Sequence, residues 1–135
     1  IGVVDLETKE LLWQKPIGTA KETGPLNIPT RLPLTVGTPQ TGGTVTTAGG
    51  LIFSAGAFDN TVRATGLFDG QELWNESIPF TAQGTPMTYL SPEGKQTLIV
   101  VVPVFNSTRG SGYEPLAAEN EDPLGGYVFA YRLPD

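Results

Sequence analysis

The sequence contains neither cysteine nor histidine. Without cysteine the chain has no disulfide, no thiolate nucleophile and no thiolate ligand for a metal. Without histidine it also lacks an imidazole base and an imidazole zinc ligand, so a general base within it would have to be a carboxylate. No apolar run approaches the roughly 20 residues of a membrane-spanning helix. No charged-then-apolar leader is present either, so we expect neither a span nor a signal peptide in this sequence.

Positive charge is also scarce. Eight Lys and Arg stand against 14 Asp and Glu, which gives the 135 residues a net charge of −6. This balance opposes binding to phosphate backbones and to anionic lipid, so we expect no nucleic-acid partner. Chain breakers, in contrast, are abundant, with 17 Gly and 12 Pro. Because they leave few uninterrupted stretches for helices, the composition predicts an all-β fold of about one domain's size.

Short strands separated by turn residues are predicted along most of the chain. Residues 1–18 are typical of a hairpin that ends a preceding repeat. Residues 19–42 contain four prolines, which predicts a long crossing loop that covers a sheet face or contacts a partner. We expect one complete repeat of four strands in 43–80 and a last repeat in 81–135, interrupted by a polar insertion at 105–126. The predicted strands are 2–6, 11–16, 44–47, 51–55, 61–67, 71–79, 85–90, 97–104 and 127–133.

An internal repeat suggests the architecture. The segment VVDLETKELLW (3–13) aligns with ATGLFDGQELW (64–74), which places Trp13 over Trp74, and residues 127–133 begin a third copy. A unit of four short antiparallel strands with one Trp in its last strand is typical of a β-propeller blade. The two tryptophans would then fill the gap between neighbouring blades. A sandwich with core tryptophans and a chance repeat remains the alternative.

A longer series of motifs resembles one family. GGTVTTAGGLIF, DNTVRA, GQELW, GTPMTY and a closing YVFAY follow one another in the chain. Over residues 42–104 and 125–134 the sequence resembles the C-terminal end of membrane-bound quinoprotein dehydrogenases of the glucose dehydrogenase type. The resemblance implies a partial β-propeller, the C-terminal blades of an eight-bladed one. Pyrroloquinoline quinone (PQQ) and a divalent cation, Ca²⁺ or Mg²⁺, would lie near its axis. A chain that opens within strand-like sequence, without Met, agrees with a piece of a longer polypeptide.

The resemblance also implies a reaction. Such an enzyme oxidises a sugar, polyol or cyclic hydroxy acid at the periplasmic face of the bacterial inner membrane and passes the electrons to ubiquinone. The cation and most of the active site would lie outside this segment, so we expect no catalytic residue and no metal site within it. The segment alone would be inactive, and its open strand edges would favour self-association. An alternative of another class is a non-catalytic propeller piece that serves as a binding or assembly scaffold.

One pair of residues is the candidate cofactor site. The resemblance implies that Asp59, the Asp of the D-N-x-x-R-A turn, lies at the cofactor with Asn60 beside it. Asp and Asn are also preferred in tight turns, so the residues alone leave a purely structural turn open.

The segment before the last strand departs from the family. Glucose-oxidising members have a His there, and this chain has none. The difference favours a polyol or a cyclic hydroxy acid over glucose as substrate. Asn106 and Arg109 are candidates to lie near the position that the His occupies in those members. The acidic residues within 105–126 lack the spacing of a calcium-binding loop and predict a solvated loop instead.

Overall fold

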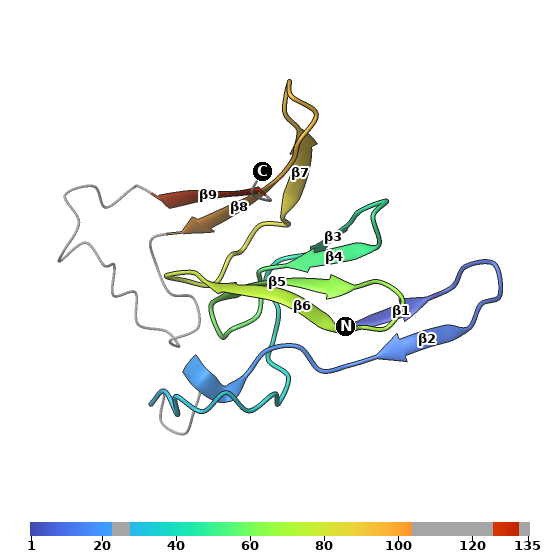
Figure 1. The fold of residues 1–135 in the computed structure, drawn as a ribbon. Coiled ribbons are helices and arrows are strands. Elements are labelled where there is room, and N and C mark those ends of the chain that lie inside the picture. The colour runs from blue at the N-terminus through green and yellow to red at the C-terminus, as the bar shows by residue number, and fades with distance from the viewer. Residues whose placement is uncertain (23–27, 104–125, 133–135) are drawn as a thin grey trace.

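The computed structural model describes residues 1–22, 28–103 and 126–132 of the chain. In these ranges it contains nine short β-strands and one 3-10 turn, η1 (Ala20–Glu22), but no α-helix. The strands form three antiparallel sheets in which neighbours follow one another along the chain (Figure 1). The all-β prediction is confirmed. No helix in the described ranges is long and apolar enough to cross a membrane.

Two strands form the first sheet, four the second and three the third. Each predicted strand has an observed counterpart, although several end earlier than predicted. In chain order the strands are β1 (Gly2–Val4), β2 (Leu11–Gln14), β3 (Thr44–Thr46), β4 (Leu51–Ser54), β5 (Thr61–Gly66), β6 (Glu72–Ser77), β7 (Met87–Leu90), β8 (Gln96–Pro103) and β9 (Gly126–Arg132).

The first sheet is the predicted hairpin of β1 and β2. Its turn is closed by Asp5, whose carboxylate accepts hydrogen bonds from the N–H groups of Glu7 at 2.8 Å and Thr8 at 3.3 Å. These backbone hydrogen bonds lower the pKa of Asp5 below its usual value of 3.8, because they favour the charged carboxylate. Trp13 lies opposite Val3 in the ladder.

The second sheet is organised around β5, all of whose residues are buried. Side chains alternate between the two faces of a strand. On one face Val62 belongs to an apolar cluster, while on the other the polar side chains of Thr61, Arg63 and Thr65 line a cavity. The central strand therefore carries one apolar and one polar face.

The apolar face of the second sheet packs against the third. Seven buried residues form the cluster: Ala55, Val62, Ile78, Ala82, Leu98, Val100 and Val102. At its margin Trp74 of β6 meets Tyr131 of β9 edge to face, with ring centroids 5.1 Å apart. Along β9 the rings of Tyr127, Phe129 and Tyr131 stack on one another. Burial of these side chains joins the two sheets.

In the third sheet one predicted boundary, the end of the insertion at residue 126, is wrong. Gly126, expected at the end of the insertion, starts β9 because it pairs with Pro103 of β8. The rest of the predicted insertion, including Asn106 and Arg109, lies outside the described residues. The division of the chain into repeats at 18, 42 and 80 stays a prediction.

Candidate functional site

The turn that contains Asp59 and Asn60 connects β4 to β5. Asn60 has a φ of 53°, in the left-handed region that Asn tolerates better than most residues. Its N–H donates to the Ala57 carbonyl at 3.3 Å, and its own carbonyl accepts a hydrogen bond from Ile78 N–H at 2.8 Å. The sequence Asp-Asn is thus suited to the turn as well as to a site.

The carboxylate of Asp59 is buried, with 2% of the residue exposed. Arg63 binds it with both terminal nitrogens, Nη1 at 2.9 Å from Oδ1 and Nη2 against Oδ2. The backbone N–H of Thr19 also donates to Oδ2, at 2.8 Å. One carboxylate therefore joins the turn, strand β5 and the start of the crossing loop.

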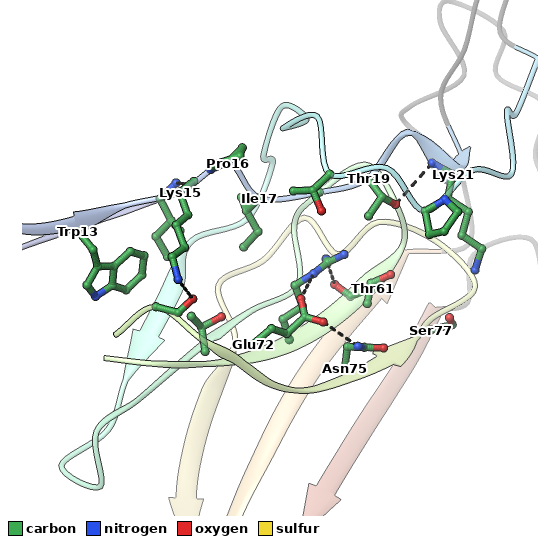
Figure 2. A pocket seen from close by; sticks show the side chains of 17 residues that line it. Trp13, Lys15, Pro16, Ile17, Thr19, Lys21, Thr61, Glu72, Asn75 and Ser77 are labelled. Atoms are coloured by element: carbon green, nitrogen blue, oxygen red, sulfur yellow. Dashed lines mark hydrogen bonds and ion pairs between the residues drawn. The ribbon is translucent and has the colours of Figure 1, made fainter. Parts of the chain in front are cut away.

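Arg63 also binds a second carboxylate, that of Glu72 on β6. Its Nε donates to Oε2 of Glu72 at 3.0 Å, and Oε1 of Glu72 accepts a hydrogen bond from Asn75 at 2.7 Å (Figure 2). The side chain of Arg63 is 7% exposed and that of Glu72 is 45% exposed. A buried guanidinium needs such partners, since an uncompensated buried charge is strongly destabilising. We call Asp59, Arg63 and Glu72 the charge chain.

Asn60 has a different environment from Asp59. Its Oδ1 accepts a hydrogen bond at 2.8 Å from the hydroxyl of Thr81, a residue with 1% exposure. This bond sets the orientation of the amide. Within the described part of the chain Nδ2 of Asn60 makes no hydrogen bond, so the amide retains two donor hydrogens.

The crossing loop contacts the same turn at several points. The hydroxyl of Thr38 accepts a hydrogen bond from Phe58 N–H at 3.0 Å, and Gln40 forms an isolated bridge with Ala57. Together with the bond from Thr19 to Asp59, these contacts fix the turn from both ends of the loop.

A cavity of about 460 Å³, lined by both polar and apolar side chains, lies between the chain that follows β2 and the polar face of β5 and β6 (Figure 2). Its lining includes Lys15, Thr19, Thr61 and Glu72. The ammonium of Lys15 donates to the carbonyls of Asp69 and Gly70, both at 2.9 Å, so it holds the first sheet to the second. Neither of the predicted cofactor residues is among the described residues that line the cavity.

Trp13 makes the second contact between these sheets. Its Nε1–H donates to the Leu67 carbonyl at 2.7 Å, and its ring lies against Gly70 in the turn between β5 and β6. These contacts place the Trp13 side chain between the first and second sheets, while its role between propeller blades stays a prediction.

Sequence reasoning placed Asp59 and Asn60 in one turn but missed the partners of Asp59. Arg63, Glu72 and Thr19 were not singled out, and the one available signal was the Arg of DNTVRA, four residues after the Asp. Of the residues that the structure describes, no group of three or more Asp or Glu is placed to hold a metal ion.

The sequence of the chain matches a known protein family. Residues 1–98 match the PQQ family model, described as the β-propeller domain of glucose, ethanol and alcohol dehydrogenases. Among solved structures, a europium-containing methanol dehydrogenase covers 73% of this chain and 14% of its own, with 26% identity and a TM-score of 0.48. The family assignment does not rest on that structure.

Curated relatives match along almost the whole chain. The glycerol dehydrogenase large subunit of Gluconobacter oxydans is 47% identical over 100% of this chain. The quinate/shikimate dehydrogenase (quinone) of Acinetobacter baylyi is 39% identical over 96% of it, and the quinoprotein glucose dehydrogenase of Escherichia coli is 36% identical over 100%. The chain spans 15 to 17% of the length of these relatives. The predicted resemblance is confirmed, and the chain belongs to the PQQ-dependent dehydrogenase β-propeller family.

Proposed function

We propose that this chain is the C-terminal part of the propeller domain of a PQQ-dependent, quinone-linked dehydrogenase. The observation that carries the proposal is the family match over residues 1–98, together with relatives named as dehydrogenases that align along the whole chain. The small share of their length that it spans supports a partial propeller, which we take to belong to an eight-bladed ring. As a segment it would not turn over alone.

We propose a polyol or a cyclic hydroxy acid as substrate. The relatives named for glycerol and for quinate or shikimate share 47% and 39% identity with this chain, against 36% for the Escherichia coli enzyme named for glucose. The absence of His from the chain agrees with this choice.

PQQ fits one of the two predicted site residues better than the other. The carboxylates and quinone oxygens of the cofactor accept hydrogen bonds, so the protein partners of those groups are donors or cations. Among the described residues the Nδ2 group of Asn60 has no acceptor, whereas the Asp59 carboxylate is acceptor-only and already bound. When bound, PQQ supplies the electron acceptor for oxidation of the substrate carbinol. The role of this chain's residues is to bind and orient, with Asp59 and Asn60 at the margin of the cofactor site.

We place the enzyme at the periplasmic face of the bacterial inner membrane, with ubiquinone as electron acceptor and a Ca²⁺ or Mg²⁺ ion held mainly by residues outside this segment. The word quinone in the name of the quinate/shikimate relative supports the acceptor class. Apolar side chains exposed on the first and third sheets, such as Leu11 at 57% and Val128 at 69%, support self-association of the segment alone.

The experiment uses the full-length polypeptide that contains this segment. The apoprotein is loaded with PQQ and Ca²⁺ or Mg²⁺ and assayed with a soluble ubiquinone analogue on glycerol, quinate and glucose. We expect PQQ-dependent oxidation, fastest with glycerol or quinate. Binding of PQQ with preference for glucose would contradict the substrate class alone. No binding of PQQ would contradict the enzyme and favour the scaffold.

A further inference from the structure

The cavity between the first and second sheets gathers much of the positive charge of an acidic chain. Three of the eight Lys and Arg residues line it, namely Lys15, Lys21 and Arg63. Glu72 supplies the one carboxylate among the described lining residues. Arg63 is already matched by Glu72 and by the buried Asp59, so the charge that is available to a ligand is that of the two lysines.

Lys15 and Lys21 form no ion pair within the described ranges of the chain. Lys15 donates two of its three ammonium hydrogens to the carbonyls of Asp69 and Gly70, and keeps one. The ammonium of Lys21 has no hydrogen-bond partner among the residues that the structure describes. Both cations can therefore bind a ligand without breaking a contact of the fold.

The hydroxyl of Thr65 is a third free group in the cavity. Thr65 is 7% exposed, lines the cavity and makes no side-chain hydrogen bond with the described residues. No side-chain oxygen in those residues is both sealed from solvent and unpaired, so this hydroxyl reaches the open space of the cavity. Both oxygens of Glu72, in contrast, already accept hydrogen bonds. Lys15, Lys21 and Thr65 thus offer donors to an acceptor-rich ligand.

We propose that this cavity binds a small organic anion with two separated carboxylates. Figure 2 shows Lys15 and Lys21 toward opposite ends of the cavity, with Thr61 between them, so each ammonium meets one carboxylate. The apolar side chains of Ile17 and Pro33 line the same cavity and suit a carbon skeleton. Its volume of about 460 Å³ is within the range of sites for small organic ligands.

Two features favour a dicarboxylate over a single oxyanion. An inorganic phosphate or a monocarboxylate would bind at one lysine and leave the other unpaired, whereas a dicarboxylate forms charge-assisted hydrogen bonds at both. An inorganic ion also gains nothing from the apolar part of the lining. The site does not rest on the proposed function, because its ligand is recognised without PQQ and without turnover.

The first test measures which anion binds. The full-length apoprotein is titrated calorimetrically with a series of aliphatic dicarboxylates from succinate to suberate, and with butyrate and inorganic phosphate. We expect one chain length to bind best, with a Kd at least about tenfold below those of butyrate and phosphate, and to weaken in high salt. Equal affinity for butyrate or phosphate would overturn the two-carboxylate ligand, and binding of none of these anions would overturn the site.

The second test places the binding in this cavity. Lys21→Met and Thr65→Val each remove a group that has no side-chain partner among the described residues, so neither should destabilise the fold appreciably. Each should raise the Kd of the best dicarboxylate about fivefold, the effect of losing one exposed ion pair or one hydrogen bond. Lys9→Met, in the turn of the first hairpin and outside the cavity lining, is the matched control and should leave Kd unchanged. Equal Kd values in all three variants would place the binding elsewhere.

A repeat of the titration after loading with PQQ separates this site from the cofactor. Because neither Asp59 nor Asn60 is among the described lining residues, we expect PQQ to leave the affinity for the dicarboxylate unchanged. Competition between the two ligands would overturn a separate site. If the protein binds the dicarboxylate but not PQQ, the proposed function falls and this inference stands.

Discussion

The indole of Trp13 lies directly on Gly70. A Cβ built on that glycine would come within 2.8 Å of two atoms of the ring, closer than carbon atoms approach one another. The indole N–H at the same time donates to the Leu67 carbonyl at 2.7 Å. A side chain from the first sheet is therefore fitted to a turn of the second that is 54 residues away in sequence.

Gly70→Ala should detach the first sheet from the second. The residue has a φ of +63°, and its new methyl group would collide with Trp13, so backbone strain and overpacking combine. Gly94→Ala is the matched control, since Gly94 has a φ of +77° and open space around a Cβ. We expect urea unfolding of the chain to show a loss of about 1 kcal/mol for Gly94→Ala and roughly 1 to 3 kcal/mol more for Gly70→Ala. Equal losses would show that the ring does not press on the turn.

Trp13→Phe should remove the hydrogen bond to Leu67 and keep most of the ring. The expected loss in the free energy of unfolding is about 1 kcal/mol for the bond, in addition to the smaller ring's reduced packing. Trp74→Phe is the comparison, because Trp74 packs edge to face on Tyr131 and its indole N–H makes no hydrogen bond within the described residues. Urea unfolding of both variants should show the larger loss for Trp13→Phe. The reverse order would contradict the role of the Leu67 bond.

Two carboxylates bind Arg63, and their removal should have unequal effects. Asp59→Asn leaves a guanidinium of which 7% is exposed without its buried counter-charge, so we expect a loss of roughly 3 to 5 kcal/mol. Glu72→Gln removes a partner that is 45% exposed, and the expected loss is under about 1 kcal/mol. Denaturant unfolding at neutral pH measures both. A small effect of Asp59→Asn would mean that Arg63 finds water or another acceptor.

The strands and their order could be predicted from sequence because turn residues and alternation act locally. Gly, Asp and Asn mark the ends of β4, β5 and β6, and the repeated Trp marks the last strand of a unit. The partners of Asp59 could not be predicted in this way. Arg63 binds Asp59 from the strand that follows the turn, four residues later, and Thr19 donates to it from 40 residues away in sequence. Such contacts depend on how the loop closes over the sheet.

The free energy of unfolding should fall in alkaline solution because of Tyr131. Burial, and then the negative charge of Glu76, raise the pKa of this phenol above 10.0 in the folded chain. The unfolded chain therefore loses its proton first, so stability is intact below pH 10.0 and decreases as pH rises from there toward the folded pKa. Tyr131→Phe keeps the ring beside Trp74 and should reduce this decrease. Denaturant unfolding on either side of pH 10.0 measures the difference, and an unchanged slope in Tyr131→Phe would exclude this phenol as its source.

Self-association of the segment should depend on the outer face of the third sheet. Val101 and Val128 are cross-strand partners there, with 57% and 69% exposure, and Met87 on the neighbouring strand is 56% exposed. Since the opposite face of this sheet is packed on the second, the exposed one is the apolar surface that a second copy could cover. Val101→Lys with Val128→Lys should shift the segment toward monomer in sedimentation velocity, because a lysine ammonium resists transfer from water into an apolar contact. Gln96→Lys, on an exposed position of β8, controls for added charge and should leave association unchanged. Association that is equal in all three proteins would place the contact elsewhere, with the hairpin residues Val4 and Leu11 as the next face to test.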